Sequence, residues 1–302
     1  MTDMTVGLIG LGAMGGGMAR RLIDKGFPPA VFDIDSQKVA ELTELGARSC
    51  ASPAEVAAVA DVTLLSLPNS RLVEAVVLGP DGALAGARAG TVVVDMSSSD
   101  PDSTLALGER FVEAGVEFLD APVSRGARAA RDGTMSILVG GAAETLARVR
   151  PVLDQLGTDI VHAGPLGAGH AAKALNNHMS ATALLAAMEG FFVAVKAGVD
   201  PELAVTAINQ GSGRSHMTDV RFPLYYLPRQ FTSNFALGLM EKDCRIAAEM
   251  AARSGRPMLL GALTSQLYRV AMNRGMGPAD NTRVLELMEE LLNARLSADP
   301  AQ

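Results

Sequence analysis

The residues of this sequence best suited to chemistry are Lys173 and Asn177, which lie in an alanine-rich apolar run directly after a glycine-rich turn. Residues four apart on a helix share one face, so Lys173, Asn177 and Gly169 would line a single surface, with Gly169 leaving room for a ligand. The positive end of the helix dipole and an apolar setting would both lower the pKa of Lys173. Such a lysine can take the proton of a hydroxyl group as hydride leaves the adjacent carbon, while Asn177 orients the hydroxyl or a carboxylate. The spacing by itself fits an ordinary solvated lysine better, so this inference depends on the rest of the chain.

A second polar segment, residues 120–126 (Asp-Ala-Pro-Val-Ser-Arg-Gly), follows a predicted strand. Ligands of doubly wound sheets bind at the carboxyl ends of the strands. Ser124, Arg125 and the backbone amides around Gly126 could hold a substrate carboxylate, with the arginine acting as a planar fork. A turn with a solvent-facing arginine is the equally simple alternative.

A dinucleotide-binding fingerprint stands near the N-terminus. Its first glycine allows a tight turn, the second lets the backbone approach a pyrophosphate, and the third lets the next helix pack closely on the strand. A strand-like run before it and a helical run after it set it apart from a chance cluster of glycines. The segment predicted to bind the cofactor consists of Gly10, Leu11, Gly12, Ala13, Met14 and Gly15.

Asp33 ends the next strand-like run. A carboxylate at that place can accept hydrogen bonds from both ribose hydroxyls and repels a 2′-phosphate. The neighbouring Ile34 and Asp35 supply no cation. The sequence therefore predicts NAD as the cofactor, with NADP as the alternative. Asp33 could instead cap the following helix, a role for which Ser36 competes.

Up to about residue 163, short apolar runs alternate with helical stretches. Several runs are apolar on consecutive residues, as in a parallel sheet covered by helices on both faces. Two helix starts are well marked, because Ser36 would cap a helix that stops at Gly46, and Ser52-Pro53-Ala54-Glu55 forms a capping box. The predicted strands cover residues 5–9, 30–32, 62–66, 91–94, 116–119, 135–139 and 159–161.

After Gly169 the strand pattern disappears. Residues 171–197 contain no proline and are apolar nearly all round, which predicts a long helix buried between other elements or subunits. Asp200-Pro201 would start the next helix, and further helices are predicted over residues 237–252 and 278–295.

Strand–helix alternation followed by helices alone predicts an α/β protein with two domains. Residues 1–164 would form an N-terminal Rossmann domain with a doubly wound sheet, and residues 165–302 an all-α C-terminal domain for substrate binding and oligomerisation. The 302 residues are enough for two cores. A net charge of −7 excludes the basic surface expected of a nucleic-acid-binding protein.

Cysteines and histidines indicate neither disulfide nor metal chemistry. Cys50 and Cys244 lie far apart without a CxxC pair, which predicts a reduced, cytoplasmic protein. The four histidines lack the spacing of a metal site. The apolar run over residues 6–19 has no basic segment before it and is too short to span a bilayer, so we expect neither a signal peptide nor a membrane partner.

Four segments, in order, resemble the motifs of the β-hydroxyacid dehydrogenase family, typified by 3-hydroxyisobutyrate dehydrogenase. Residues 7–19 resemble its cofactor signature, 120–124 its substrate loop, 167–177 its catalytic helix and 235–243 its C-terminal Lys-Asp motif. The resemblance spans nearly the whole chain. It implies a Rossmann domain followed by an all-helical domain that drives the formation of dimers or tetramers.

The resemblance also implies roles for single residues. Lys173 would be the catalytic acid/base, Asn177 a substrate ligand, and Ser124 with the two following residues the loop that holds the substrate. The positions that touch the cofactor in relatives correspond to Leu67, Pro68, Ser98 and Lys242, of which the last closes over it.

One residue departs from the family pattern. Relatives usually have two glycines after the serine, whereas the first of these positions is Arg125 here. Some relatives that act on anionic three-carbon aldehydes or acids, such as sulfolactaldehyde, also have an arginine near this point. We hypothesise that the substrate has a second anionic group, or is smaller, and that Arg125 is its counter-ion.

Together these features predict an NAD(P)-dependent oxidoreductase that interconverts a small β-hydroxy acid, similar to 3-hydroxyisobutyrate, and its semialdehyde, with Lys173 moving the proton. Alternatives of the same reaction type are reductases of sulfolactaldehyde, tartronate semialdehyde or succinic semialdehyde. An imine reductase or a non-catalytic nucleotide-bound module would share the architecture, but such relatives usually replace the lysine that this chain keeps. The expected partners are a small anionic substrate and further copies of the chain, in a homodimer or homotetramer.

Overall fold

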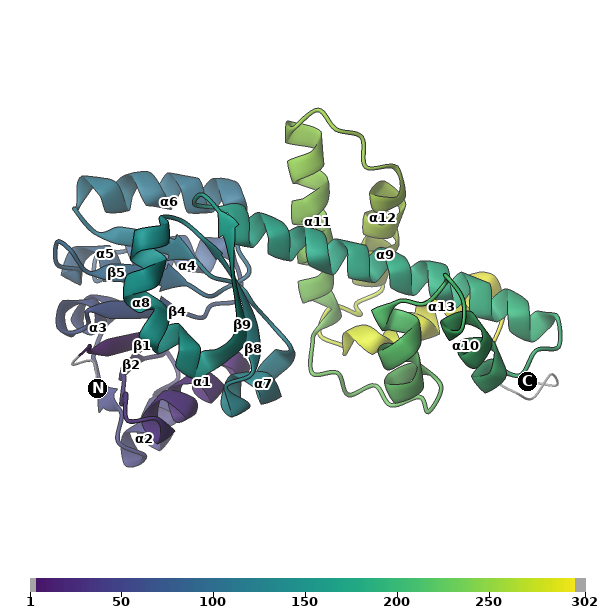
Figure 1. Ribbon diagram of the computed structural model, residues 1–302, viewed down its shortest axis with the longest axis horizontal. Helices are drawn as coiled ribbons and strands as arrows, with labels where there is room; N and C mark the ends of the chain where they lie inside the picture. The colour runs from purple at the N-terminus through teal and green to yellow at the C-terminus, as the bar shows by residue number, and fades with distance from the viewer. Residues whose placement is uncertain (1–3, 297–302) are drawn as a thin grey trace. The chain divides into compact units, whose positions relative to one another are not determined.

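The computed structural model describes residues 4–296 and divides into two compact units, which meet in sequence between Lys173 and Ala174 (Figure 1). The N-terminal unit is a mixed β-sheet with helices on both faces, and the C-terminal unit is built from helices. Each unit has a hydrophobic core of its own. The boundary expected between residues 164 and 165 lies just before helix α9 (Ala168–Lys196), which passes from one unit into the other.

The sheet of the N-terminal unit has six parallel strands in the order β3-β2-β1-β4-β5-β6, followed by β8, which is antiparallel to both β6 and β7 and parallel to β9. The antiparallel edge differs from the parallel sheet that the sequence predicts. Helix α7 (Gly126–Asp132), about 10 Å long at 1.5 Å per residue, is too short to return the chain to the opposite edge of the sheet. The strands are β1 (Val6–Ile9), β2 (Ala30–Phe32), β3 (Arg48–Ser49), β4 (Val62–Leu65), β5 (Val92–Asp95), β6 (Glu117–Asp120), β7 (Val123–Ser124), β8 (Met135–Gly140) and β9 (Gly157–Gly164).

Helices connect these strands, and capping side chains mark where some of them start. The Ser52 hydroxyl accepts a hydrogen bond from the amide of Glu55, which confirms Ser52 as the cap of α3, whereas the Glu55 carboxylate accepts from the amide of Ala51 instead of closing the predicted capping box on Ser52. The cap of α2 is Asp35 and not Ser36, because the helix begins at Ser36 and the Asp35 carboxylate accepts an amide proton of its first turn. The other helices of this unit are α1 (Ala13–Asp24), α2 (Ser36–Glu44), α3 (Pro53–Val59), α4 (Ser70–Leu78), α5 (Ala83–Gly86), α6 (Pro101–Glu113) and α8 (Ala143–Leu156).

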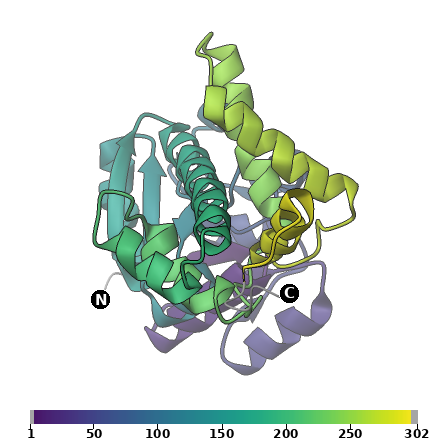
Figure 2. The same cartoon turned by 90° about the vertical axis from the view of Figure 1, so that its right-hand side faces the viewer.

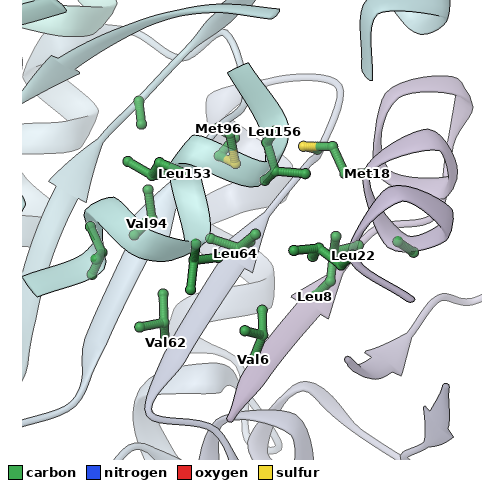
Figure 3. Close-up of a cluster of buried hydrophobic side chains, with 14 of the residues drawn as sticks. Val6, Leu8, Met18, Leu22, Val62, Leu64, Val94, Met96, Leu153 and Leu156 are labelled. Atoms are coloured by element: carbon green, nitrogen blue, oxygen red, sulfur yellow. The ribbon is translucent and has the colours of Figure 1, made fainter. Parts of the chain in front are cut away.

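Successive side chains along each strand point to opposite faces of the sheet, so that a hydrophobic core forms on each face. On one face, Leu8 and Leu64 lie in a cluster with Met18 of α1 and with leucines of α8 (Figure 3). The next residues along the same strands, Ile9 and Leu65, belong to the core on the opposite face, under α3, α4 and α6. Because both faces are covered, the strands are apolar on consecutive residues, as the sequence pattern indicates.

Helices of the C-terminal unit follow the predictions in part. Asp200 caps α10 by accepting hydrogen bonds from two amides of its first turn. The helix predicted over residues 278–295 begins later, because Asp280 starts a short 3-10 turn, η2, ahead of α13. The sequence pattern did not predict helix α12 or the π-helix η1. Helix α12 lies beside α11 in both views (Figure 1, Figure 2). The elements are α10 (Pro201–Asn209), η1 (Met217–Tyr226), α11 (Leu237–Arg253), α12 (Leu259–Asn273), η2 (Asn281–Arg283) and α13 (Val284–Leu292).

Helix α9 is long and apolar enough to cross a membrane by length and composition, and 39% of its most apolar stretch is buried inside the protein. Long core helices of water-soluble proteins meet the same criterion. The helix is buried on one side, through residues such as Met188, and exposes Leu175, Met179 and Val193, which are 37%, 70% and 70% exposed. The all-round burial expected from the sequence is therefore only half satisfied within one chain.

Candidate active site

The loop between β1 and α1 leaves space for a pyrophosphate. Gly10 has φ +93°, and a Cβ atom there would lie 2.3 Å from the carbonyl oxygen of Ser66. A Cβ atom on Gly15 would lie 1.8 Å from the Gly10 carbonyl oxygen, so α1 starts in direct backbone contact with the loop. A Cβ atom on Gly12, in contrast, would meet nothing within 4 Å. This open side at a helix N-terminus fits the pyrophosphate of a dinucleotide, which the backbone amides at the start of α1 would hold.

Asp33 follows β2 and lies beside the glycine loop. One of its carboxylate oxygens accepts a hydrogen bond from the amide of Leu11 (2.6 Å), and the other from the amide of Asp35 (2.8 Å). The alternative role of capping α2 belongs to Asp35 instead. Lys38 of α2 forms an ion pair with Asp35 (3.2 Å), and its hydrogen bond is the main reason why the pKa of Asp35 is lowered.

The loops after β4 and β5 are tied together at the carboxyl edge of the sheet. The amide of Leu67 donates to the hydroxyl oxygen of Ser97 (2.9 Å), and the amide of Ser97 donates to the buried carboxylate of Asp95 (2.9 Å). These two loops contain Leu67, Pro68 and Ser98, the residues expected to touch the cofactor. They follow adjacent parallel strands, at the edge where such sheets bind their ligands.

Lys173 and Ser124 meet in the N-terminal unit although 49 residues separate them. The ammonium group of Lys173 donates a hydrogen bond to the Ser124 hydroxyl oxygen (2.9 Å). Ser124 ends the short strand β7, and Lys173 lies in the second turn of α9. Only 8% of Lys173 is exposed, so it differs from the solvated lysine that its spacing alone would suggest. The structure thus places a buried amine against the predicted substrate loop.

The start of α9 is held by Asp120, a residue of the predicted substrate loop for which the sequence indicates no role of its own. Its two carboxylate oxygens accept hydrogen bonds from the amides of Gly167 (2.7 Å) and His170 (2.6 Å). A Cβ atom on Gly169 would lie 2.3 Å from the Leu138 carbonyl oxygen and 2.8 Å from the Asp120 carboxylate. We expected Gly169 to leave room for a ligand, and this prediction is wrong. The glycine instead lets the helix pack directly on Asp120.

Arg125 lies in the left-handed region, with φ +82°, where glycine is the favoured residue. Its guanidinium donates to the Thr134 carbonyl oxygen (3.0 Å) and the Thr158 hydroxyl oxygen (3.1 Å), and it forms an ion pair with Asp159 (2.7 Å). Hydrogen bonds from Thr158 and then Arg125 lower the pKa of Asp159. Arg125 thus ties the turn after β7 to β9, and Gly126, with φ +75°, begins α7.

In the C-terminal unit, Asn177 is held by Asp243, the aspartate of the C-terminal Lys-Asp motif. The side-chain amide of Asn177 donates to the Asp243 carboxylate (2.6 Å), and both residues are buried. The Lys242 ammonium lies 3.4 Å from the same carboxylate. Within residues 4–296, no group of three or more His, Cys, Asp or Glu side chains is placed to hold a metal ion.

Two family models together match most of the chain. Residues 5–164 match the NAD-binding domain of 6-phosphogluconate dehydrogenase, and residues 167–288 match the NAD-binding domain of NADP-dependent 3-hydroxyisobutyrate dehydrogenase. The first match contains the glycine loop and Ser124, and the second contains Lys173 and Asn177.

Full-length relatives are similar to this chain. The 2-(hydroxymethyl)glutarate dehydrogenase of Eubacterium barkeri is 36% identical over 98% of both chains, and the mitochondrial 3-hydroxyisobutyrate dehydrogenase of Mus musculus is 33% identical over 94% of this chain and 87% of its own. The structure of Mycobacterium tuberculosis 3-hydroxyisobutyrate dehydrogenase with L-serine aligns with a TM-score of 0.88 at 29% identity, covering 94% of this chain and 99% of that one. Identity at this level over whole chains, together with the nucleotide loop, shows that this protein belongs to the β-hydroxyacid dehydrogenase family and is an NAD(P)-dependent dehydrogenase acting on CH–OH groups.

Proposed function

We propose that this protein oxidises the primary alcohol of a small β-hydroxy acid to the semialdehyde, with NAD as the preferred cofactor and Lys173 as the proton acceptor. The observation that supports the proposal most directly is the 2.9 Å hydrogen bond between the buried Lys173 amine and the Ser124 hydroxyl. It brings a group that can transfer a proton to the loop that would hold the substrate.

Bound NAD(P) supplies the hydride acceptor, its nicotinamide ring. The substrate carboxylate would accept hydrogen bonds from the Ser124 hydroxyl and from the backbone amides around Gly126. The alcohol then lies next to the Lys173 nitrogen, which in its amine form accepts the hydroxyl proton as the C–H bond breaks and returns it in the reverse reaction. Asn177, one helical turn further along α9, is the second proposed substrate ligand, and Asp243 orients its amide.

The names of the similar proteins suggest which part of the substrate is constant. 3-Hydroxyisobutyrate, 2-(hydroxymethyl)glutarate and L-serine, named for three relatives, all contain a primary alcohol on the carbon next to C2, which bears the carboxylate. They differ at C2, which has a methyl, a carboxyethyl or an ammonium group. We therefore propose a 3-hydroxypropanoate with one substituent at C2 as the substrate class, and the fixed alcohol and carboxylate match the positions of Lys173 and Ser124.

The preference for NAD rests on Asp33 and its surroundings. Its carboxylate is fixed beside the glycine loop by the amides of Leu11 and Asp35, where it would accept the ribose hydroxyls and repel a 2′-phosphate. Lys38, a cation in the first turn of α2, is paired with Asp35. Comparing kcat/KM for NAD and NADP tests this preference, and an equal or higher value with NADP would contradict it.

The decisive experiment combines a substrate panel with matched lysine variants. Purified protein is assayed with 3-hydroxyisobutyrate, 2-(hydroxymethyl)glutarate and L-serine, following NADH absorbance. Lys173→Ala should keep its affinity for NADH and lose about 100-fold or more in kcat, because the proton acceptor is gone. Asn177→Ala should mainly raise KM. Lys25→Ala, which removes an exposed lysine at the C-terminal end of α1, should match the wild type.

Two outcomes would overturn the proposal. Absence of turnover on the whole panel, in either direction, would reject the substrate class. Turnover by Lys173→Ala within about threefold of the wild type would reject its role in proton transfer, since general acid–base catalysis contributes at least about 100-fold.

We further propose that the protein is a homo-oligomer, as a dimer or tetramer, and cytoplasmic. The exposed side of α9 supports the first point, because Met179 and Val193 are large apolar side chains that water covers in the single chain, and Gly190 between them permits a close approach. The sequence pattern of the two cysteines, Cys50 and Cys244, which lie far apart without a CxxC pair, supports a reducing compartment.

A further inference from the structure

We infer that His170 is a positioning residue for this reaction, and that its ring couples the loop expected to touch the cofactor to the helix that presents Lys173. The inference rests on the proposed function, because it uses Lys173 as the proton acceptor. All the residues involved belong to the N-terminal unit.

The ring of His170 is fully buried and bonded on both sides. Its Nε2 lies 3.1 Å from the carbonyl oxygen of Ser97, and its Nδ1 lies 2.8 Å from the hydroxyl of Thr104. A carbonyl oxygen can only accept, so Nε2 must be the protonated nitrogen of this contact. The ring therefore bridges the loop after β5 and helix α6.

The backbone of His170 is fixed as firmly as its ring. Its amide donates to the buried carboxylate of Asp120 at the end of β6, which also accepts the amide of Gly167. The absence of side chains on Gly140 and Gly169 lets this carboxylate reach the helix, since a Cβ atom on either would lie within 3 Å of it. The first turn of α9 is thus held rigidly to the carboxyl edge of the sheet, three residues before Lys173.

Ser97 extends the connection to the other loop at this edge. Its carbonyl accepts from His170, its hydroxyl oxygen accepts from the amide of Leu67, and its own amide donates to Asp95. One serine thereby joins the loop after β4, the loop after β5 and helix α9. Hydride and proton leave the same carbinol group in this reaction, so the loops beside the cofactor and the lysine must keep a fixed spacing. His170 is the side chain of α9 that supplies this link.

Two substitutions of similar polarity separate the two ring contacts. The amide nitrogen of glutamine reaches roughly the position of Nε2, and that of asparagine roughly that of Nδ1. His170→Gln can therefore restore the bond to Ser97, whereas His170→Asn can reach only Thr104. Thr104→Val, which removes the second ring contact while keeping side-chain shape, serves as the control.

With 3-hydroxyisobutyrate and NAD, we expect His170→Asn to lose about 10- to 100-fold in kcat and to show a larger primary deuterium isotope effect, because misplaced groups slow the chemical step. His170→Gln and Thr104→Val should stay within about threefold of the wild type. Equal kcat values for His170→Gln and His170→Asn, with equal isotope effects, would overturn the inference.

Amide hydrogen exchange gives a readout that needs no turnover. In His170→Asn, the amides of Ser66, Leu67 and residues 96–99 should exchange faster than in His170→Gln, since only the second variant restores the Ser97 link. Equal protection in the two variants would overturn the coupling. A wild-type protein that is inactive on the whole panel would instead reject the proposed function and leave this exchange comparison to decide the inference on its own.

Discussion

Two glycines of the nucleotide loop should respond in opposite ways to the same substitution. Gly15→Ala places a Cβ atom 1.8 Å from the Gly10 carbonyl oxygen, and both partners are backbone. Gly12→Ala adds a methyl group where nothing lies within 4 Å, at φ −63° and ψ −168°, a conformation that alanine adopts readily. Gly15→Ala should therefore lower the stability of the fold, and Gly12→Ala should change only the affinity for the cofactor.

The expected sizes follow from these contacts. Overpacking of this kind costs about 1–3 kcal/mol, and each kcal/mol lowers Tm by about 2–4 °C in a chain of this size class. Gly15→Ala should thus melt about 2–12 °C lower. Gly12→Ala should melt at or slightly above the wild-type temperature, because alanine narrows the unfolded ensemble. If its methyl group prevents one charge-assisted hydrogen bond to the pyrophosphate, worth about 1.5–3 kcal/mol, the Kd for NADH should rise about 10- to 150-fold.

Thermal melting of the cofactor-free protein and fluorescence titration with NADH measure the two effects separately. Gly211→Ala is the matched control, since its Cβ atom would come no closer than 3.7 Å to a neighbour and it lies outside the loop. NADH binding by Gly12→Ala equal to that of the wild type would show that the pyrophosphate does not approach there. An unchanged Tm for Gly15→Ala would refute the close contact between α1 and the loop.

Two further predictions concern the substrate loop and the assembly. Arg125→Gly should lower kcat/KM for the dianion 2-(hydroxymethyl)glutarate relative to the monoanion 3-hydroxyisobutyrate by about two- to fivefold, the size of an exposed ion pair. Asp159→Ala releases the guanidinium and should change this ratio in the opposite direction. A ratio that is unchanged in both variants would leave Arg125 only its role in holding the loop. Val193→Glu, on the exposed side of α9, should shift the protein to a smaller species in sedimentation velocity. Val112→Glu, which changes an exposed valine of α6, should leave the size of the species unchanged. Equal sedimentation of the two variants would contradict an interface on α9.

Much of the N-terminal unit is predictable from sequence because its signals are local. Consecutive apolar residues mark strands covered on both faces, and Ser52 and Glu55 mark a helix start within four residues. The three glycines of the nucleotide loop each have a backbone role that any such loop requires. The antiparallel edge around β8 has no local signal, since it follows from how far a short helix can carry the chain.

The C-terminal unit is less predictable for the same reason. Its π-helix lies over a proline-containing stretch without a regular apolar period, and α12 has three large leucines that stay exposed in the single chain, which obscures its inward face. The start of α13 depends on Asp280, whose carboxylate also accepts bonds from residues 233 and 234, far away in sequence. Such contacts form only when distant segments meet.

The sequence by itself determined the dinucleotide-binding loop, because its three glycines stand at short, fixed spacing. It indicated Lys173 as the residue that transfers a proton only through the ordered resemblance of four segments to one family, since the spacing around the lysine fits a solvated side chain equally well or better. Only the tertiary structure decided what surrounds that lysine. It brought Ser124 to Lys173 across 49 residues, assigned Gly169 to packing, placed Asp120 under the first turn of α9 and set the His170 ring against the loop after β5. A buried polar side chain must find its partners within the fold, and no pattern along the chain specifies partners that only folding brings together.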